Sequence, residues 1–269
     1  MNGLFTGDFD PITIADIQLA RKVKKEQNLE YIYFYLHKEG QTDYACRLEM
    51  LKRMIKPYRK FKILEKTIQK NACVVIEENK QLQKEVRQGN FQYIPKYIRS
   101  YIMEKGLYCR TIIHAQLKEK RYLHSLSVAE LSKRIAETNH MDKQKAYLIG
   151  IYHDIAKNLS SKENRIYISI DDPYEKEYPE AVWHQYIGYY LLKHYYCLRD
   201  KDMLKAIRHH CLGDDDSPYS QLIFVADKLD PSRGYDSSKE IELTLHNLKN
   251  GFATVKLQNE NYLKKEGVK

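Results

Sequence analysis

The spacing of apolar residues changes near residue 110 and divides the chain into two parts. Before that point, brief apolar runs at 1–5, 31–36 and 72–76 are bounded by polar turns. The segments 12–25 and 43–55 between them carry apolar residues at helical spacing. Strands separated by helices predict a parallel α/β sheet. Beyond residue 117, helical spacing recurs in successive segments with few strand-like runs between them, at 121–138, 142–157, 180–195, 201–210, 217–230 and 238–264. This second part is expected to be all-α.

The segment 95–108 is expected to end the first part. Pro95 stands where a helix would begin and Gly106 where it would stop, which is the usual asymmetry of the two residues. The boundary should therefore lie near 108–116, and we assign 1–110 and 111–269 to two domains. A chain of 269 residues is long enough for both to bury a core.

Composition excludes several classes of protein. Charged residues make up 30% of the chain and apolar residues 43%, which favours a globular protein over a disordered or fibrous one. The longest apolar run falls well short of the roughly 20 residues that cross a bilayer, and the first residues lack the layout of a signal peptide. We therefore expect a cytoplasmic protein without a membrane partner. Its five cysteines are scattered and form no CxxC pair, so reduced thiols are expected rather than disulfides or a zinc ribbon.

The net charge of +9 is unevenly placed along the chain. Residues 1–110 carry 21 Lys and Arg against 13 Asp and Glu, whereas residues 111–269 carry 24 against 23. Most of the excess falls in the run from Lys52 to Lys70. No aromatic stacking motif accompanies this run, so a solvated, lysine-rich helix and strand are favoured over a nucleic-acid site.

The histidines gather in the second part of the chain. Of the ten, only His37 and His114 precede residue 116. The acid of the pair His153-Asp154 follows an apolar helical run, and so does Asp227. A carboxylate placed there is costly unless a cation or a metal compensates it. Three further histidines, His140, His194 and His246, are interpreted as packed or solvated side chains.

The order H…HD…H…H…D, with each element of the pattern on its own predicted helix, resembles the HD superfamily of metal-dependent phosphohydrolases over residues 121–236. The stretches RYLHSLSVAE, IYHDIAK, WHQYIGY, AIRHHCLG and VADKLDPSRGYD further resemble the bacterial YqeK-type HD proteins. The activity of that family is symmetrical cleavage of bis(5'-nucleosyl)-tetraphosphates. The resemblance implies hydrolysis of diadenosine tetraphosphate to two ADP by a binuclear centre of divalent ions, with iron as the metal.

The resemblance also implies the ligands of the two ions. His124, His153, Asp154 and Asp227 would surround one ion, with Asp154 bridging to the second. His184 and His210 would bind that second ion. The family pattern selects the second histidine of the pair His209-His210.

Three cations beside these residues are expected to hold the phosphates of the substrate. They are Arg121, Lys157 and Arg233, and we assign a catalytic role to Asp154 and Lys157. Surface ion pairing is the competing interpretation of each cation. Two other functions stay open, namely another HD phosphohydrolase or phosphodiesterase activity and a non-enzymatic scaffold for nucleotides or RNA. The oligomeric state and the preferred base stay open too.

The sequence GLFTGDFDPITIAD lies between the first strand and the first helix, where a nucleotide-binding domain would carry its phosphate loop. It resembles the GxFDPxHxGH signature of nicotinate-mononucleotide adenylyltransferases. That family has two histidines where this chain has Thr13 and Asp16, and an aspartate would repel a phosphate. We therefore expect a degenerate, shortened nucleotidyltransferase-like domain without adenylyltransferase activity. Its role would be structural or regulatory, and the surviving Gly3, Phe5, Gly7 and FDP triplet would permit residual nucleotide binding.

Overall fold

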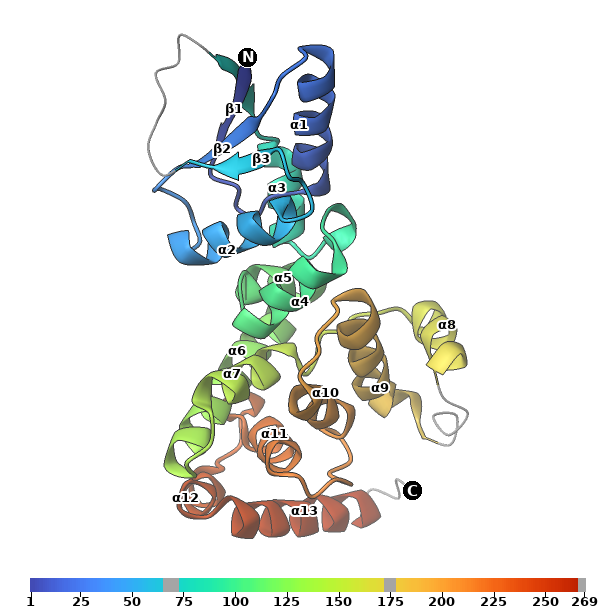
Figure 1. Ribbon diagram of the computed structural model, residues 1–269. Helices are drawn as coiled ribbons and strands as arrows, with labels where there is room; N and C mark the ends of the chain where they lie inside the picture. Colours follow the sequence, from blue (N-terminus) through green and yellow to red (C-terminus); the bar gives the residue numbers. More distant parts are fainter. Residues whose placement is uncertain (65–72, 172–177, 266–269) are drawn as a thin grey trace. The chain divides into compact units, whose positions relative to one another are not determined.

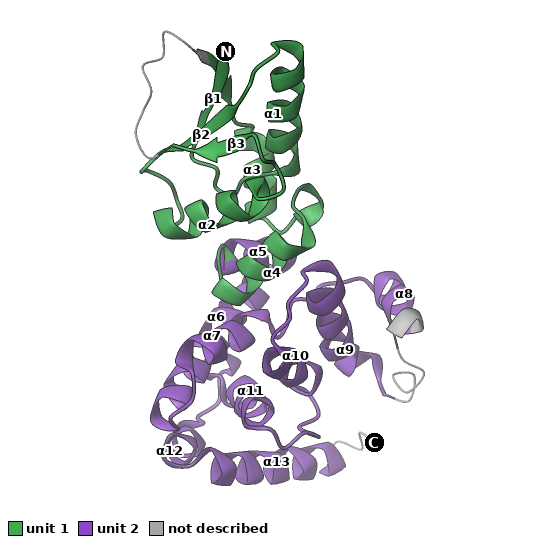
Figure 2. Ribbon diagram, in the orientation of Figure 1, with its two compact units in different colours: residues 1–108 green, residues 109–269 purple. Residues whose placement is uncertain are grey.

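The computed structural model describes residues 1–64, 73–171 and 178–265. It divides into two compact units, residues 1–108 and 109–269 (Figure 2). This division lies close to the limit at 110 that was expected. The last part of the lysine-rich run and the first residue of the strand expected at 72–76 lie outside the described residues.

The first unit is built on a parallel sheet of four strands in the order β3-β2-β1-β4 (Figure 1). The strands are β1 (Asn2–Gly7), β2 (Ile32–Leu36), β3 (Phe61–Ile63) and β4 (Cys73–Glu77). This order is that of the first four strands of a Rossmann-type sheet. The alternation of strands and helices predicted the parallel pairing. The sequence did not predict β3, because it is only three residues long and lies inside the lysine-rich run.

The helices of this unit are α1 (Ile14–Glu26), α2 (Tyr44–Ile55), α3 (Lys80–Arg87) and α4 (Lys96–Lys105). Gly106 ends α4 in the left-handed conformation, with a φ of 68°. The core beside the sheet is aromatic. The ring of Phe5 lies 5.3 Å from those of both Phe9 and Phe34, and all three side chains are fully buried.

The turn between β1 and α1 makes its hydrogen bonds within the chain. Thr13 and Asp16 form a capping box at the start of α1, and the second carboxylate oxygen of Asp16 accepts the backbone N–H of Asn79. The carboxylate of Glu78 accepts the backbone N–H groups of Asp8 at 3.0 Å and Phe9 at 2.7 Å. Two backbone donors of this turn are thus held by an internal carboxylate.

The second unit consists of helices joined by turns and loops, with no strand among its described residues. Its helices are α5 (Cys109–Gln116), α6 (Glu119–Thr138), α7 (Lys143–Tyr152), α8 (Ser161–Asp171), α9 (Trp183–Tyr190), α10 (Lys201–Arg208), α11 (Pro218–Leu229), α12 (Ser238–His246) and α13 (Leu248–Lys265). Residues 222–227 of α11 are buried, and this helix packs on α6, α7, α10 and α13. Gly150 of α7 lets the helix lie against the backbone of Ala129 in α6, because a Cβ there would stand 2.5 Å from the Cα of Ala129.

Two of the expected helices, over 142–157 and 180–195, are interrupted in the structure. The helix expected over 142–157 ends at Tyr152, and the next residues form tighter turns through bonds such as that of Lys157 N–H to the carbonyl of Asp154 at 2.8 Å. The segment 180–195 divides into a 3₁₀ turn at Glu180–Val182, α9 and a π-helical turn at Leu191–Tyr195. Helix α8 was not expected at all.

The helix expected over 238–264 breaks at Asn247, which has an extended backbone. The amide side chain of Asn139 holds both sides of the break. Its oxygen accepts the N–H of Leu248 at 2.9 Å, and its nitrogen donates to the carbonyl of Thr244 at 3.0 Å. A distant side chain thus replaces the hydrogen bonds that a continuous helix would make.

Two expectations about the whole chain can be compared with the described residues. Cys46, Cys109, Cys197 and Cys211 are free thiols there, as the scattered cysteines predicted. Within the described ranges, every helix is too short or too polar to cross a membrane.

Candidate metal centre

Five elements of the second unit bring the six predicted ligands together. His124 lies on α6, His153 and Asp154 follow α7, and His184 is the second residue of α9. His210 follows α10, and Asp227 lies near the end of α11. All six side chains are buried, which is unusual for a set of imidazoles and carboxylates without compensation.

One part of the cluster joins α6, α7 and α11. The Nε2 atom of His124 lies 3.1 Å from Oδ1 of Asp227, and Nε2 of His153 lies 3.8 Å from the same oxygen. Donor atoms of these three residues all lie within 4.8 Å of one another. They are close enough to share one ion.

The other part of the cluster centres on Asp154. Its Oδ1 lies 3.2 Å from Nε2 of His184 and 3.8 Å from Nε2 of His210, while its Oδ2 lies 3.7 Å from Nε2 of His153. The two oxygens of Asp154 therefore face different histidines. This is the placement that a bridging carboxylate requires.

The imidazoles are held with Nε2 directed into the cluster. Nδ1 of His153 donates to the carbonyl of Gly150 and Nδ1 of His210 to that of Ile207, both at 2.7 Å. Nδ1 of His124 lies 2.6 Å from Oδ2 of Asp230. A proton on Nδ1 leaves a lone pair on Nε2, which is the arrangement of a metal-binding histidine.

The environment of His153 indicates that these residues could bind a metal ion. Its Nε2 is buried and has no hydrogen-bond partner among the described residues. An orphaned acceptor costs about 1–3 kcal/mol, so an isolated nitrogen beside two carboxylates calls for a cation. The histidine and aspartate groups thus suit a divalent metal.

The pKa values agree with a cluster of opposed charges. Burial lowers the pKa of His153 to about 4, which keeps its imidazole neutral. Burial also disfavours ionisation of Asp154, but His153, His184 and His210 outweigh it and hold the pKa of Asp154 well below its usual range. Burial opposes protonation of His124, whereas Asp227 and Asp230 raise its pKa to about 9. Asp227 contacts the Nε2 atom that faces the cluster, whereas Asp230 contacts Nδ1 on the other side of the ring.

The three predicted cations reach the cluster, two of them at its carboxylates and Lys157 at an imidazole. Nη1 of Arg121 lies 3.4 Å from Oδ2 of Asp154, and Nη2 of Arg233 lies 2.5 Å from Oδ1 of Asp227. Nζ of Lys157 lies 3.1 Å from Nδ1 of His184. Lys157 reaches the cluster from the turn after α7 rather than from a helix.

The sequence reasoning missed three residues of this region. Lys228 adds a fourth cation, 3.4 Å from Oδ2 of Asp227. Asp230 is fully buried and contacts His124, Ser127 and Ser232, and its place three residues after Asp227 in DKLDPSRG was the signal available. Sγ of Cys211 lies 3.2 Å from Nε2 of both His184 and His210. Its place directly after His210 was the only signal for it in the sequence.

His209 and Cys211 flank the predicted ligand on either side. His209 turns away from the cluster, and its Nδ1 lies 2.7 Å from Oδ1 of Asp214. Burial opposes ionisation of the Cys211 thiol, but His210 and His184 outweigh burial and lower its pKa to about 6. The structure thus places His210, and not His209, beside the other predicted ligands.

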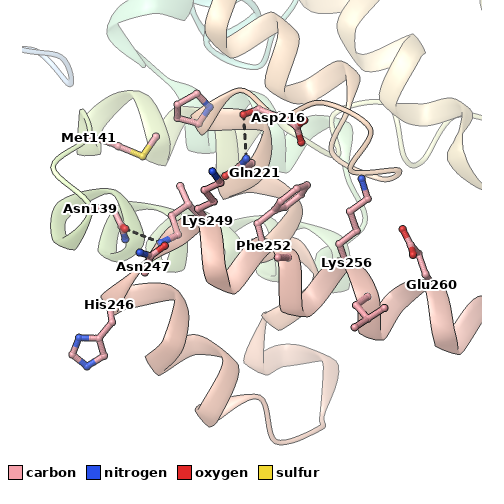
Figure 3. Close-up of a pocket in the computed structure, with 14 residues that line it drawn as sticks. Asn139, Met141, Asp216, Gln221, His246, Asn247, Lys249, Phe252, Lys256 and Glu260 are labelled. Carbon is pink, nitrogen blue, oxygen red and sulfur yellow. Dashed lines mark hydrogen bonds between the residues drawn. The ribbon is translucent and has the colours of Figure 1, made fainter.

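A cavity of about 450 Å³ opens onto the cluster. Its walls include Asp154, His184 and Asp227 together with the cations Arg121, Lys157 and Arg233. A larger groove of about 950 Å³ lies elsewhere in the unit, lined in part by Asn139, Gln221 and Lys256 (Figure 3). Those polar side chains bond the carbonyls of Thr244, Asp216 and Gly213. These three side chains of the larger groove thus hydrogen-bond the backbone, whereas the smaller cavity is lined by predicted site residues.

Comparison with known proteins agrees with this assignment of the fold. Residues 121–232 match the family model of the HD domain. A solved structure of a predicted HD superfamily hydrolase from Clostridium acetobutylicum, described as involved in NAD metabolism, has the same fold, with a TM-score of 0.55. It is 24% identical, and the match covers 59% of this chain and 87% of that one.

Two curated relatives extend the comparison. A protein of Mycoplasma genitalium named probable nicotinate-nucleotide adenylyltransferase/Ap4A hydrolase is 30% identical over 62% of this chain and 50% of its own length. A symmetrical bis(5'-nucleosyl)-tetraphosphatase of Bacillus subtilis is 30% identical over 51% of this chain and 74% of its own length. The chain spans about half the length of the Mycoplasma relatives that it matches. The similarity of its helical unit to these relatives shows that the chain belongs to the HD-domain family of symmetrical bis(5'-nucleosyl)-tetraphosphatases.

Proposed function

We propose that the protein hydrolyses dinucleoside polyphosphates and converts diadenosine tetraphosphate to two ADP. The observation that carries the proposal is the orphaned Nε2 of His153 in a buried cluster of imidazoles and carboxylates, which opens onto a cation-lined cavity. The relatives named for this activity support the choice of substrate.

In this proposal the six predicted ligands hold two divalent ions, with iron as the proposed metal. His124, His153 and Asp227 hold one ion, His184 and His210 hold the other, and Asp154 contributes an oxygen to each. Divalent ions, when bound, activate water for attack on phosphorus and neutralise charge on the phosphate oxygens. The buried imidazole and carboxylate donors fix the positions at which this chemistry would take place.

The cations orient the polyphosphate over the ligands. Arg121 reaches the cluster from α6 and Arg233 from the turn after α11, so they approach it from different elements. Their guanidinium groups can each hold two phosphate oxygens. Lys157 lies at the same cavity and supplies a further positive charge for the phosphates. We propose that these three side chains align the scissile anhydride bond.

A second cavity provides room for the other half of a dinucleotide. It measures about 580 Å³ and shares Lys228, Arg233 and Asn259 with the cavity at the cluster. Tyr235 and Tyr262 line it and expose 52% and 61% of their surface, so either ring can stack on a base. Two adjoining cavities with cations at their common wall suit a substrate that carries a nucleoside at each end of its phosphate chain.

The test is turnover of diadenosine tetraphosphate by the full chain, with products separated by ion exchange and metal assayed in the same sample. We expect ADP as the sole product and about two metals per chain. Asp154→Asn should lower turnover by at least about 10³-fold, because it removes a charge from both halves of the cluster. Asp202→Asn, at an exposed ion pair with Lys145, is the matched control.

Each alternative outcome has a distinct meaning. Bound metal without turnover would contradict the proposed substrate while leaving the metal centre intact. Absence of both metal and turnover would contradict the enzyme and favour a nucleotide scaffold. Full turnover by Asp154→Asn would contradict the assigned ligands.

A further inference from the structure

We propose that Cys211 is a thiolate ligand of the second metal position, beside Asp154, His184 and His210. The inference rests on the proposed metal centre and adds a donor of different chemistry to it. It makes this half of the cluster a mixed sulfur, nitrogen and oxygen site.

The donor atoms of Cys211, His184 and His210 form one compact triangle, and all three lie within 4.8 Å of one another. Sγ of Cys211 lies 3.2 Å from Nε2 of His184 and 3.2 Å from Nε2 of His210. Those two nitrogens are 3.2 Å apart, and Oδ1 of Asp154 lies 3.2 and 3.8 Å from them. With bonds of about 2.0–2.3 Å, the ligand atoms of a tetrahedral metal stand about 3.3–3.8 Å apart. The observed separations are close to these edges.

The backbone fixes the thiol in this position. The N–H of Cys211 donates to Oε1 of Gln185 at 3.0 Å, and Gln185 is fully buried on α9 next to His184. His210 is anchored in turn through its Nδ1 to the carbonyl of Ile207. The histidines and the cysteine are therefore held by neighbouring anchors.

Hydrogen bonds alone do not account for the close approach of the Cys211 sulfur to both His184 and His210. Two imidazole nitrogens lie at the same distance from the sulfur and 3.2 Å from each other, so each of the three atoms faces the other two. Nδ1 of His210 contacts the carbonyl of Ile207, which leaves its Nε2 directed at the sulfur and available as a metal donor. A cation between sulfur and nitrogens would satisfy all the lone pairs together.

A thiolate changes which metals the position accepts. Sulfur is a soft donor that favours zinc, iron or cobalt, whereas magnesium and manganese prefer oxygen ligands. Cys211 would therefore make the second position selective against magnesium and manganese.

The test is cobalt substitution of the full chain, read by absorption spectroscopy. Thiolate ligation should produce a near-ultraviolet sulfur-to-cobalt charge-transfer band in the wild type. Cys211→Ser should abolish that band and keep the visible ligand-field bands of cobalt, with affinity at this position lowered about 10–100-fold. Cys46→Ser, which alters a thiol in the other unit, should retain the full spectrum.

A second variant keeps the test decisive if serine disturbs folding. Cys211→Asp replaces sulfur with an oxygen donor and should bind cobalt without the charge-transfer band. Absence of the band from the wild type, or its persistence in either Cys211 variant, would overturn the proposal. Turnover is measured separately, so a charge-transfer band in a protein without hydrolase activity would retain the thiolate ligand and contradict only the proposed substrate.

Discussion

At the scale of single residues, the orientation of each imidazole in the cluster is set by the hydrogen bond of its Nδ1 atom. His153 and His210 give Nδ1 to backbone carbonyls, whereas His124 faces the carboxylate of Asp230. A carboxylate partner makes the imidazole a stronger donor toward a metal than a carbonyl does. Asp230 also contacts the hydroxyls of Ser127 and Ser232, which fix its own position.

Asp230→Asn should therefore weaken metal binding without removing a ligand. We expect a loss of about 10–100-fold in affinity at the position that contains His124. Competition with a chromogenic chelator measures this loss. Asp236→Asn, at an exposed aspartate in the same loop, is the control. Unchanged affinity in Asp230→Asn would show that the contact with His124 is purely structural.

The sequence predicted the six residues of the buried cluster through their resemblance to the HD pattern, and for the two aspartates also because a buried carboxylate is costly without a cation. Asp154 and Asp227 end apolar stretches, and the histidines are concentrated in the same half of the chain. Cys211 and Asp230 escaped prediction, because a lone thiol or a further acid has ordinary explanations until the fold brings it beside an imidazole.

At the scale of elements, the helices are positioned through their ends. Asp215 connects α10 to the start of α11, since its carboxylate accepts the N–H of Ser217 at 3.0 Å and pairs with Lys205 at 2.6 Å. The sequence predicted most helices but not where they stop. The break at Asn247 depends on Asn139, which lies more than 100 residues away in the sequence.

Asp215→Asn should destabilise the helical unit by about 1 kcal/mol at pH 7. Burial opposes ionisation of Asp215, but Lys205 and Ser217 outweigh it and hold the pKa well below its usual range. A depressed folded pKa means that the stabilisation is complete above the unfolded pKa of about 4 and is lost as the pH falls below it. The difference between Asp215→Asn and wild type should therefore shrink in acid.

Urea unfolding, followed by the fluorescence of Trp183, measures this difference. Trp183 is the single tryptophan of the chain and lies in the same unit. Asp216→Asn alters the exposed neighbouring acid and should leave the unfolding midpoint unchanged. A difference that is constant with pH would show that charge on Asp215 is unimportant.

At the scale of the whole molecule, the two units use inherited motifs differently. The helical unit brings the predicted metal ligands into one buried cluster. In the α/β unit, Thr13 and Asp16 stand where the adenylyltransferase motif has histidines, and both are buried in a capping box. Burial raises the pKa of Asp16, although hydrogen bonds from Thr13 and Asn79 oppose the rise. The alternation of strands and helices predicted the α/β fold of this unit. The hydrogen bonds of Glu78 could be identified only from the structure.

The full chain should not form a dinucleotide from nicotinate mononucleotide and ATP. The backbone donors of Asp8 and Phe9 are held by Glu78, and Thr13 and Asp16 stand at the two histidine positions of the motif. Pyrophosphate release measured by a coupled assay should equal that of a sample without enzyme. Hydrolysis of diadenosine tetraphosphate by the same sample shows that the protein is intact. Pyrophosphate formed only when both substrates are present would contradict this prediction.

The carboxylate of Glu78 also bears on the evolutionary history of the first unit. Histidines restored at positions 13 and 16 would still meet a loop whose amides are bonded internally, so recovery of the ancestral reaction needs a third change at position 78. Removal of Glu78 before the histidines return would leave the N–H groups of Asp8 and Phe9 without their acceptor and gain no activity. Because position 78 governs whether these amides are available, changes at positions 13 and 16 alone should leave them closed to a phosphate.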